Sequence, residues 1–265
     1  MGRHVKSLEV FAVLLGDQAA LSPVETFYQR ILAGNPDEAL DKAEAMLATQ
    51  SLLDYYDGVV LGGLKLAADD EARGSIDRRR AGELTNSMLT VIGDLDDHVD
   101  AASPPPALDG SSLPAQSPRS GLVACVAGRG PFDDAVSAML AQLLRQRGLP
   151  TILVPHTAVS RYASPHLDVA DVRVFAVSYL TLTGSPTHLR YLIKRLRQRA
   201  PRATIIVGLW PESEALLTDA ALQRSLGADR YVASLRQAVA AALEPGTAPA
   251  LAPSSPVVEG MATSA

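Results

Sequence analysis

Cysteine is nearly absent from this sequence of 265 residues: Cys125 is the only one, and no cysteine and histidine residues have the spacing of zinc ligands. A lone thiol cannot form an intramolecular disulfide, and a structural zinc site needs several such ligands. The sequence therefore excludes a disulfide framework, makes a structural metal improbable, and fits a reducing cytoplasm.

Long apolar runs, aromatic residues and excess positive charge are also lacking. The longest N-terminal apolar run, residues 8–15, is interrupted by Glu9 and falls well short of the roughly 20 residues of a membrane-spanning helix. Aromatic residues make up 5% of the chain, so the cores must consist mainly of alanine, leucine and valine. The net charge of −5 argues against a dedicated nucleic-acid partner.

Charge and composition divide the chain into segments. Residues 1–100 carry 9 basic and 18 acidic side chains, whereas residues 101–265 carry 15 and 11. Five prolines and five serines indicate a linker at 101–120, and a similar composition predicts a disordered tail at 245–265. We expect two independently folded units, 22–98 and 121–244. The segment at 1–21 before them is juxtamembrane-like, because basic Arg3, His4 and Lys6 followed by a short apolar run are typical of the region just inside a membrane.

Apolar periodicity predicts that the first unit is a bundle of four antiparallel helices. Ser22, Pro23 and Glu25 form a helix start with a capping box, and this helix should end near Gly34. Further helices are expected from residue 35, over about 51–72, and over about 77–98.

The second unit alternates short apolar strands with helices, as parallel β-sheets do. The predicted strands are 122–127, 151–154, 172–177, 204–207 and 229–232, and the predicted helices are 134–147, 189–200, 213–222 and 234–243, with a weaker helical turn near 158–163. This pattern predicts an α/β fold with a flavodoxin-like five-stranded sheet of order 2-1-3-4-5. In such a sheet a ligand crevice forms where strands 1 and 3 diverge.

Three loops should line that crevice, and they supply the candidate ligand-binding residues. These are Gly128, Arg129, Gly130 and Pro131 after strand 1; Ser178, Tyr179, Leu180, Thr181, Thr183 and Ser185 after strand 3; and Gly208 and Trp210 after strand 4.

The candidate residues do not form a known cofactor motif. The glycines match neither a P-loop nor a dinucleotide fingerprint, and Asp133 and Asp134 should cap the following helix and repel phosphate. The hydroxyl groups of 178–185 either bind a polar ligand or cap their own loop. Trp210 either floors a ligand site or anchors its loop. Arg129 is a candidate anion contact.

Catalytic groups are not apparent in the sequence. His156, His166 and His188 have no carboxylate or nucleophile at a suggestive spacing, so we interpret them as structural or surface residues, and Cys125 as part of a core. We expect no enzyme activity, no cofactor and no metal. The six basic residues between 190 and 202 are expected to form either a solvated face or a surface that docks against the acidic bundle.

A bundle followed by a flavodoxin-like domain resembles the cobalamin-binding modules of methionine synthase and related sensors. Local stretches carry this resemblance: 32–39, Tyr55-Tyr56-Asp57, 73–76 and the Ser178-x-Leu180 motif. In that family the loop after strand 1 reads Gly-Asp-x-His-x-x-Gly, and its histidine binds cobalt. Aligned on Gly128, this chain has Pro131 in place of the histidine.

Other cofactor-handling positions differ as well. The bundle tryptophan of the family corresponds to about Glu71, its Glu-His pair to about Ala81-Gly82, and its later Gly-Gly to Gly208-Leu209. The resemblance thus implies the fold, while the departures imply that cobalamin is not bound tightly.

A second resemblance concerns residues 2–9, 14–17, 21–23 and 27–30, which are similar to the segment after the last membrane helix in proteobacterial permeases of the autoinducer-2 exporter type. Some of these permeases continue into a soluble region with stretches like 128–131 and 207–211. This implies a non-catalytic sensory or regulatory domain at the inner face of the cell membrane. The implied partners are a permease domain in cis or the membrane surface, with a small-molecule ligand still to be identified. A carrier of cobalamin or another small molecule is the alternative, and an enzyme that uses the crevice is a third.

Overall fold

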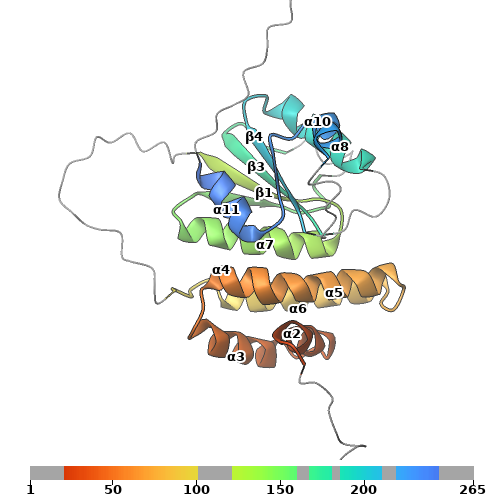
Figure 1. Ribbon diagram of the computed structural model, residues 1–265, viewed down its shortest axis with the longest axis vertical. Coiled ribbons are helices and arrows are strands. Elements are labelled where there is room, and N and C mark those ends of the chain that lie inside the picture. The colour runs from red at the N-terminus through yellow and green to blue at the C-terminus, as the bar shows by residue number, and fades with distance from the viewer. Residues whose placement is uncertain (1–20, 101–120, 160–166, 181–185, 211–218, 245–265) are drawn as a thin grey trace, which may run out of the picture.

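The structure is a computed structural model that describes residues 21–100, 121–159, 167–180, 186–210 and 219–244. A helical bundle is followed by a parallel sheet with helices on both faces (Figure 1). The strand order β2-β1-β3-β4-β5 confirms the expected flavodoxin-like α/β fold. The predicted N-terminal segment up to residue 20, the linker at 101–120 and the tail at 245–265 lie outside the described residues.

The bundle begins where the sequence signals predict. Ser22 caps the first helix: its Oγ accepts a hydrogen bond from the backbone of Glu25, and its own N–H donates to that side chain. The third predicted helix contains a π-helical turn, and such turns are uncommon and interrupt a regular helix. The helices are α2 (Pro23–Leu32), α3 (Pro36–Leu47), α4 (Leu52–Tyr55), η1 (Tyr56–Val60), α5 (Leu61–Ala72) and α6 (Arg78–Asp94).

The α/β domain also follows the predicted pattern, with two strands longer at their carboxyl ends than expected. The strands are β1 (Leu122–Ala127), β2 (Thr151–Val154), β3 (Val172–Tyr179), β4 (Thr204–Leu209) and β5 (Arg230–Val232). The helices are α7 (Pro131–Gln146), α8 (Thr187–Arg199), α10 (Ala220–Leu226) and α11 (Leu235–Leu243). Of the helix predicted at 213–222, residues 213–218 lie outside the described residues. The described helix α10 begins after Asp219, whose side chain accepts from two N–H groups of its first turn.

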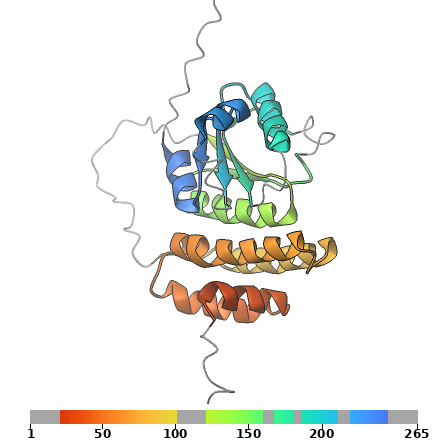
Figure 2. The same cartoon turned by 45° about the vertical axis from the view of Figure 1, so that its right-hand side comes forward.

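Side chains that alternate along each strand face two different cores. Val123 and Cys125 of β1 pack with α7 and α11, whereas Ala124 and Val126 pack on the side of α8. Figure 2 shows the resulting layers: the bundle lies below α7, and α8 and α10 cover the far side of the sheet. The two faces of the sheet therefore have different neighbours.

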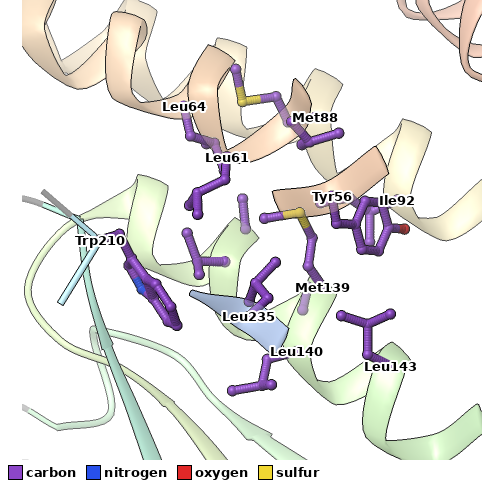
Figure 3. Packing of buried hydrophobic residues seen from close by; sticks show 14 of the residues in the cluster. Tyr56, Leu61, Leu64, Met88, Ile92, Met139, Leu140, Leu143, Trp210 and Leu235 are labelled. Atoms are coloured by element: carbon purple, nitrogen blue, oxygen red, sulfur yellow. The ribbon is translucent and has the colours of Figure 1, made fainter. Parts of the chain in front are cut away.

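The bundle and the α/β domain share one hydrophobic core, a contact that the predicted division into two independently folded units does not include. Met88 and Ile92 of α6 lie in the same buried cluster as Met139 and Leu143 of α7 (Figure 3). The reason is visible in α7, which is buried from Ala135 to Leu144 without a break. A helix that is apolar on all sides must be covered on both faces.

Of the two alternatives for the basic residues between 190 and 202, docking on the bundle is wrong. Helix α8 lies on the opposite side of the sheet from the bundle (Figure 1). Its apolar stripe covers the outer core, and its basic residues either reach backbone carbonyls and Asp229 or face solvent. Amphipathicity, rather than charge complementarity with the bundle, decides where this helix packs.

Candidate functional site

A cleft of about 630 Å³ opens between the bundle and the carboxyl-terminal edge of the sheet. It lies where α5 ends and where α6 and α7 begin, so both parts of the molecule form its walls. The bundle contributes Ala68, Glu71, Ala72, Arg78 and Gly82, and the α/β domain contributes Arg129, Gly130, Pro131, Phe132, Asp133, His156 and Leu180. This volume is within the range of small-molecule sites in proteins.

Asp133 connects the two loops that meet at the switch point of the sheet. One of its carboxylate oxygens accepts hydrogen bonds from the backbone N–H groups of Arg129, at 2.7 Å, and Gly130, at 3.2 Å. The other accepts from the N–H of Leu180 at 2.7 Å. The loops after β1 and β3 are therefore held together by one side chain, which is 4% exposed.

Burial makes this carboxylate unusual in its titration. Removal from water disfavours the charged form and raises the pKa of Asp133 to about 6, although the three backbone N–H groups act in the opposite direction. The sequence predicted that Asp133 would cap helix α7. The structure shows that it binds the Gly130 N–H at the helix start and additionally reaches across to β3.

Asp134 positions the only histidine that lines the cleft among the described residues. Its carboxylate accepts from the backbone N–H of His156 at 2.8 Å and lies 2.6 Å from the Nδ1 of the same residue. With Nδ1 directed at the carboxylate, Nε2 is the ring nitrogen left to meet a ligand. The expectation that His156 lacks a paired carboxylate is therefore wrong.

A signal for this pair was present in the sequence. Asp134 opens the helix after β1 and His156 follows β2, and these two strands are neighbours in the order 2-1-3-4-5. Residues that follow neighbouring parallel strands meet at one edge of the sheet. The two residues are 22 positions apart, so inspection of local spacing could not find the pair.

The predicted site residues separate into those that line the cleft and those that do not. Arg129, Gly130, Pro131 and Leu180 line it, and the side chains from the bundle were not among the candidates. Thr181, Thr183 and Ser185 lie outside the described residues, as does His166. Gly128, Ser178, Tyr179, Gly208 and Trp210 are buried behind the cleft wall.

Two aromatic rings of the chain itself cover the switch-point glycines. A Cβ atom at Gly128 would lie 2.4 Å from the ring of Tyr179, and one at Gly208 would lie 2.2 Å from the indole of Trp210. Both rings are 1% exposed, and the backbone N–H of Trp210 donates to the carbonyl of Tyr179. These glycines therefore make room for the protein's own rings, and Trp210 is part of the core rather than the floor of a ligand site.

Cys125 lies in the core, and His188 contacts the side chain of Tyr179. Burial raises the pKa of the Cys125 thiol to about 12, which keeps it inert in the core, as expected. The hydroxyl of Tyr179 and the Nδ1 of His188 are 2.7 Å apart. Burial, followed by Arg129 and Arg195, lowers the pKa of His188 and favours its neutral form.

The residues present do not fit cobalamin. Pro131, at the position of the family's cobalt-binding histidine, offers no side-chain ligand atom to cobalt. The rings of Tyr179 and Trp210 occupy the space over the glycines, where a cofactor tail would need close backbone approach. Ser178 keeps a buried Oγ without a hydrogen-bond partner in the described part of the chain, but one hydroxyl does not restore the site.

Comparisons with known proteins give a distant similarity to two solved structures. No family model and no curated protein matches the sequence. Among solved structures, a cobalamin-binding protein from Desulfitobacterium hafniense DCB-2 is 14% identical with a TM-score of 0.36, and 82% of this chain and 95% of that chain are covered. The methanol:cobalamin methyltransferase complex from Methanosarcina barkeri is 14% identical with a TM-score of 0.35, and 91% of each chain is covered.

Proposed function

We propose that this chain is the regulatory module of a membrane permease and that it senses a small molecule in the cleft without transforming it. The observation that carries the sensory role is that the cleft is walled jointly by α5 and α6 of the bundle and by the loops of the sheet. A molecule bound there contacts both parts at once. It can therefore favour one arrangement of the two parts over another, which is what regulation requires.

Hydrogen bonds connect the cleft walls to the beginning of the described chain. Asp70, next to Glu71 on α5, accepts from the hydroxyl of Tyr28 on α2 at 2.6 Å. Arg80, two residues after Arg78 on α6, donates to the backbone carbonyl of Leu32 at the end of α2. Helix α2 is thus tied to both bundle helices of the cleft.

The permease assignment depends on the resemblance of residues 2–9, 14–17, 21–23 and 27–30 to the segment that follows the last membrane helix of exporter-type permeases. In this proposal the described part of the chain lies in the cytoplasm at the inner face of the membrane. Among the described residues, none of the helices has the length and apolarity needed to cross a bilayer. The membrane-spanning part would precede α2 in the natural protein.

Cell fractionation tests this assignment directly. An antibody against the purified chain is used to probe membrane and soluble fractions of the source organism, and the membranes are then washed at alkaline pH. We expect a band clearly larger than the 27.9 kDa of this chain, retained in the washed membranes. A band of about that mass in the soluble fraction would contradict the proposal.

The Asp134–His156 pair favours a second candidate, an enzyme in which His156 acts as a general base. A carboxylate that orients an imidazole is a common arrangement in catalysis. The described residues that line the cleft include no serine, threonine, cysteine or lysine to serve as a nucleophile. We therefore place the sensory role first. Chemical change of a bound molecule that His156→Gln abolishes would reverse this order.

A further inference from the structure

The cleft is charged in a way that selects for a class of ligand. Two arginine residues line it, Arg78 from the bundle and Arg129 from the loop after β1. Its carboxylates are unequally available, because Asp133 already accepts three backbone N–H groups. Glu71 is the remaining acidic side chain in the wall.

The side chains of Arg78 and Glu71 are available for a ligand as far as the described residues are concerned. Neither side chain has a hydrogen bond or an ion pair with another described residue, although other arginines of α6 pair with Glu83. They extend from two helices into one cleft, so a ligand can meet a guanidinium and a carboxylate there. Arginine is well suited to bind carboxylate and phosphate groups, because its planar donors match both oxygens of the anion.

The loop and the ring that face these groups are fixed in advance. Asp133 holds the backbone at Arg129, and Asp134 holds His156 through both its N–H and its ring. Two adjacent carboxylates thus position two neighbouring loops from the first turn of α7. A site whose groups are already held loses less entropy when it binds a ligand.

We propose that the cleft binds a small organic molecule whose acidic group, a carboxylate or a phosphate, is recognised by Arg78 and Arg129. A hydroxyl or amino group of the same molecule would meet Glu71 or the Nε2 of His156. The apolar lining from Ala68, Ala72, Phe132 and Leu180 would contact its carbon skeleton. The inference deepens the proposed sensory function by naming the ligand class.

Thermal unfolding of the purified chain tests the ligand class. The probes are inorganic phosphate, succinate and glutamate at millimolar concentration, each compared with sodium chloride at the same ionic strength. A ligand that binds only the folded state raises the unfolding temperature in a saturable manner. We expect such a rise with at least one probe, and comparison of phosphate with the two carboxylates identifies the preferred group.

Matched variants separate a specific site from a general effect of anions. Arg78→Gln should weaken the effective probe at least tenfold, and Arg78→Lys should restore part of the affinity. Arg190→Gln on the exposed face of α8 should bind as the natural chain does, because α8 is remote from the cleft. Equal loss in Arg190→Gln and Arg78→Gln, or no saturable rise with any probe, would overturn the inference.

A second measurement does not depend on stability. The ring protons of His156, identified by their loss in His156→Gln, should change their NMR chemical shift as the effective probe is added. Unchanged ring resonances would contradict the assignment of this cleft. All of these experiments use the isolated chain, so binding without retention in host membranes would keep this inference and refute the permease assignment. Membrane retention without binding would do the reverse.

Discussion

The interface between the bundle and the α/β domain has two ends that differ in chemistry. At one end Tyr56, Met88 and Ile92 pack against Met139 and Leu143 without access to water. At the other end the same helices diverge into a cleft lined by Glu71, Arg78, Arg129 and His156. One pair of surfaces is therefore sealed along part of its length and open along the rest.

This difference explains how one interface can be both stable and responsive. The sealed end buries apolar side chains, and each such residue contributes about 1.5–3 kcal/mol to the free energy of unfolding. The open end contains charged groups that gain little from each other in water. A ligand at the open end can thus act on an interface that the sealed end keeps assembled.

Removal of packing at the sealed end should have the largest effect. Met139 is fully buried between α6 and the sheet, and Met139→Ala leaves a cavity. We expect the free energy of unfolding to fall by about 2–5 kcal/mol. Urea unfolding followed by circular dichroism and by the fluorescence of Trp210 should show one shared transition. Leu153→Ala, at a site that is 51% exposed, serves as the control with little change.

Two separate transitions in Met139→Ala, with the bundle signal unchanged, would show that the sealed end does not couple the two parts. The sealed end would then not be the part of the interface that keeps the bundle and the α/β domain assembled. The same outcome in the natural chain would support the expectation of independent units.

At the open end, Asp133 should give stability a distinctive pH dependence. Its pKa is raised from 3.8 in the unfolded chain to about 6 in the folded protein. Its contribution to stability is therefore fully present below about pH 4 and is lost as the pH rises through about 6. A shift of this size corresponds to roughly 3 kcal/mol, since each pKa unit is worth about 1.4 kcal/mol.

The measurement is the free energy of unfolding of the natural chain and of Asp133→Asn between pH 4 and pH 7. The difference between the two proteins should change by about 3 kcal/mol across this window, to the disadvantage of the natural chain at high pH. Asp168→Asn, at an exposed carboxylate on the outer side of the sheet, controls for the loss of one charge. If the difference in the free energy of unfolding stayed constant across this pH range, the pKa of Asp133 would not be raised by burial.

The fold follows from the sequence because local signals agree with the global pattern. Strands β1 and β2 and the capping box at Ser22 occur where periodicity and turn chemistry place them. Only the part of the cleft that the α/β domain contributes could be predicted from the sequence. Strand order identified the loop containing Arg129 and the position of Leu180, because parallel strands present their carboxyl ends at one edge.

The residues that the bundle contributes to the cleft could not be predicted in this way. They depend on how the bundle packs against the α/β domain, and the strand order carries no information about that packing. Glu71 and Arg78 reach the cleft only because α7 is covered by the bundle. The signal for that packing in the sequence is the mostly apolar stretch 135–144, in which only Ser137 and Gln142 are polar. Periodicity predicts a helix there without indicating that both of its sides are covered. The positions of Tyr179 and Trp210 after their strands predict that they line the crevice. In the structure their rings point toward Gly128 and Gly208 and fill the space above these glycines.

A smaller effect is expected from the buried polar contact at the sealed end. The hydroxyl of Tyr56 donates to the Oε1 of Gln142 at 2.6 Å, across the interface between the two parts. Tyr56→Phe leaves that amide oxygen buried without a donor, which should cost about 1–2 kcal/mol. Urea unfolding measures it, with Tyr191→Phe on the exposed face of α8 as the control. A loss equal in both variants would indicate that the contact does not strengthen the sealed end.

The smallest predicted effect concerns the π-helical turn of the bundle. This turn carries Asp57, whose two carboxylate oxygens accept from the backbone N–H groups of Leu235, at 2.6 Å, and Arg236, at 3.0 Å. The bundle thus caps helix α11 of the other part, and Asp57→Ala should lower the free energy of unfolding by about 1 kcal/mol. Asp54→Ala is the matched control, because among the described residues of that domain Asp54 meets only the exposed side chain of Arg236, and such surface pairs contribute about 0–1 kcal/mol. Hydrogen exchange of the α11 amides should increase in Asp57→Ala and stay unchanged in Asp54→Ala. Equal exchange in the two variants would mean that α11 is capped by its own residue Ser234, whose Oγ accepts from the N–H of Gln237. The π-helical turn would then not stabilise the interface at its sealed end.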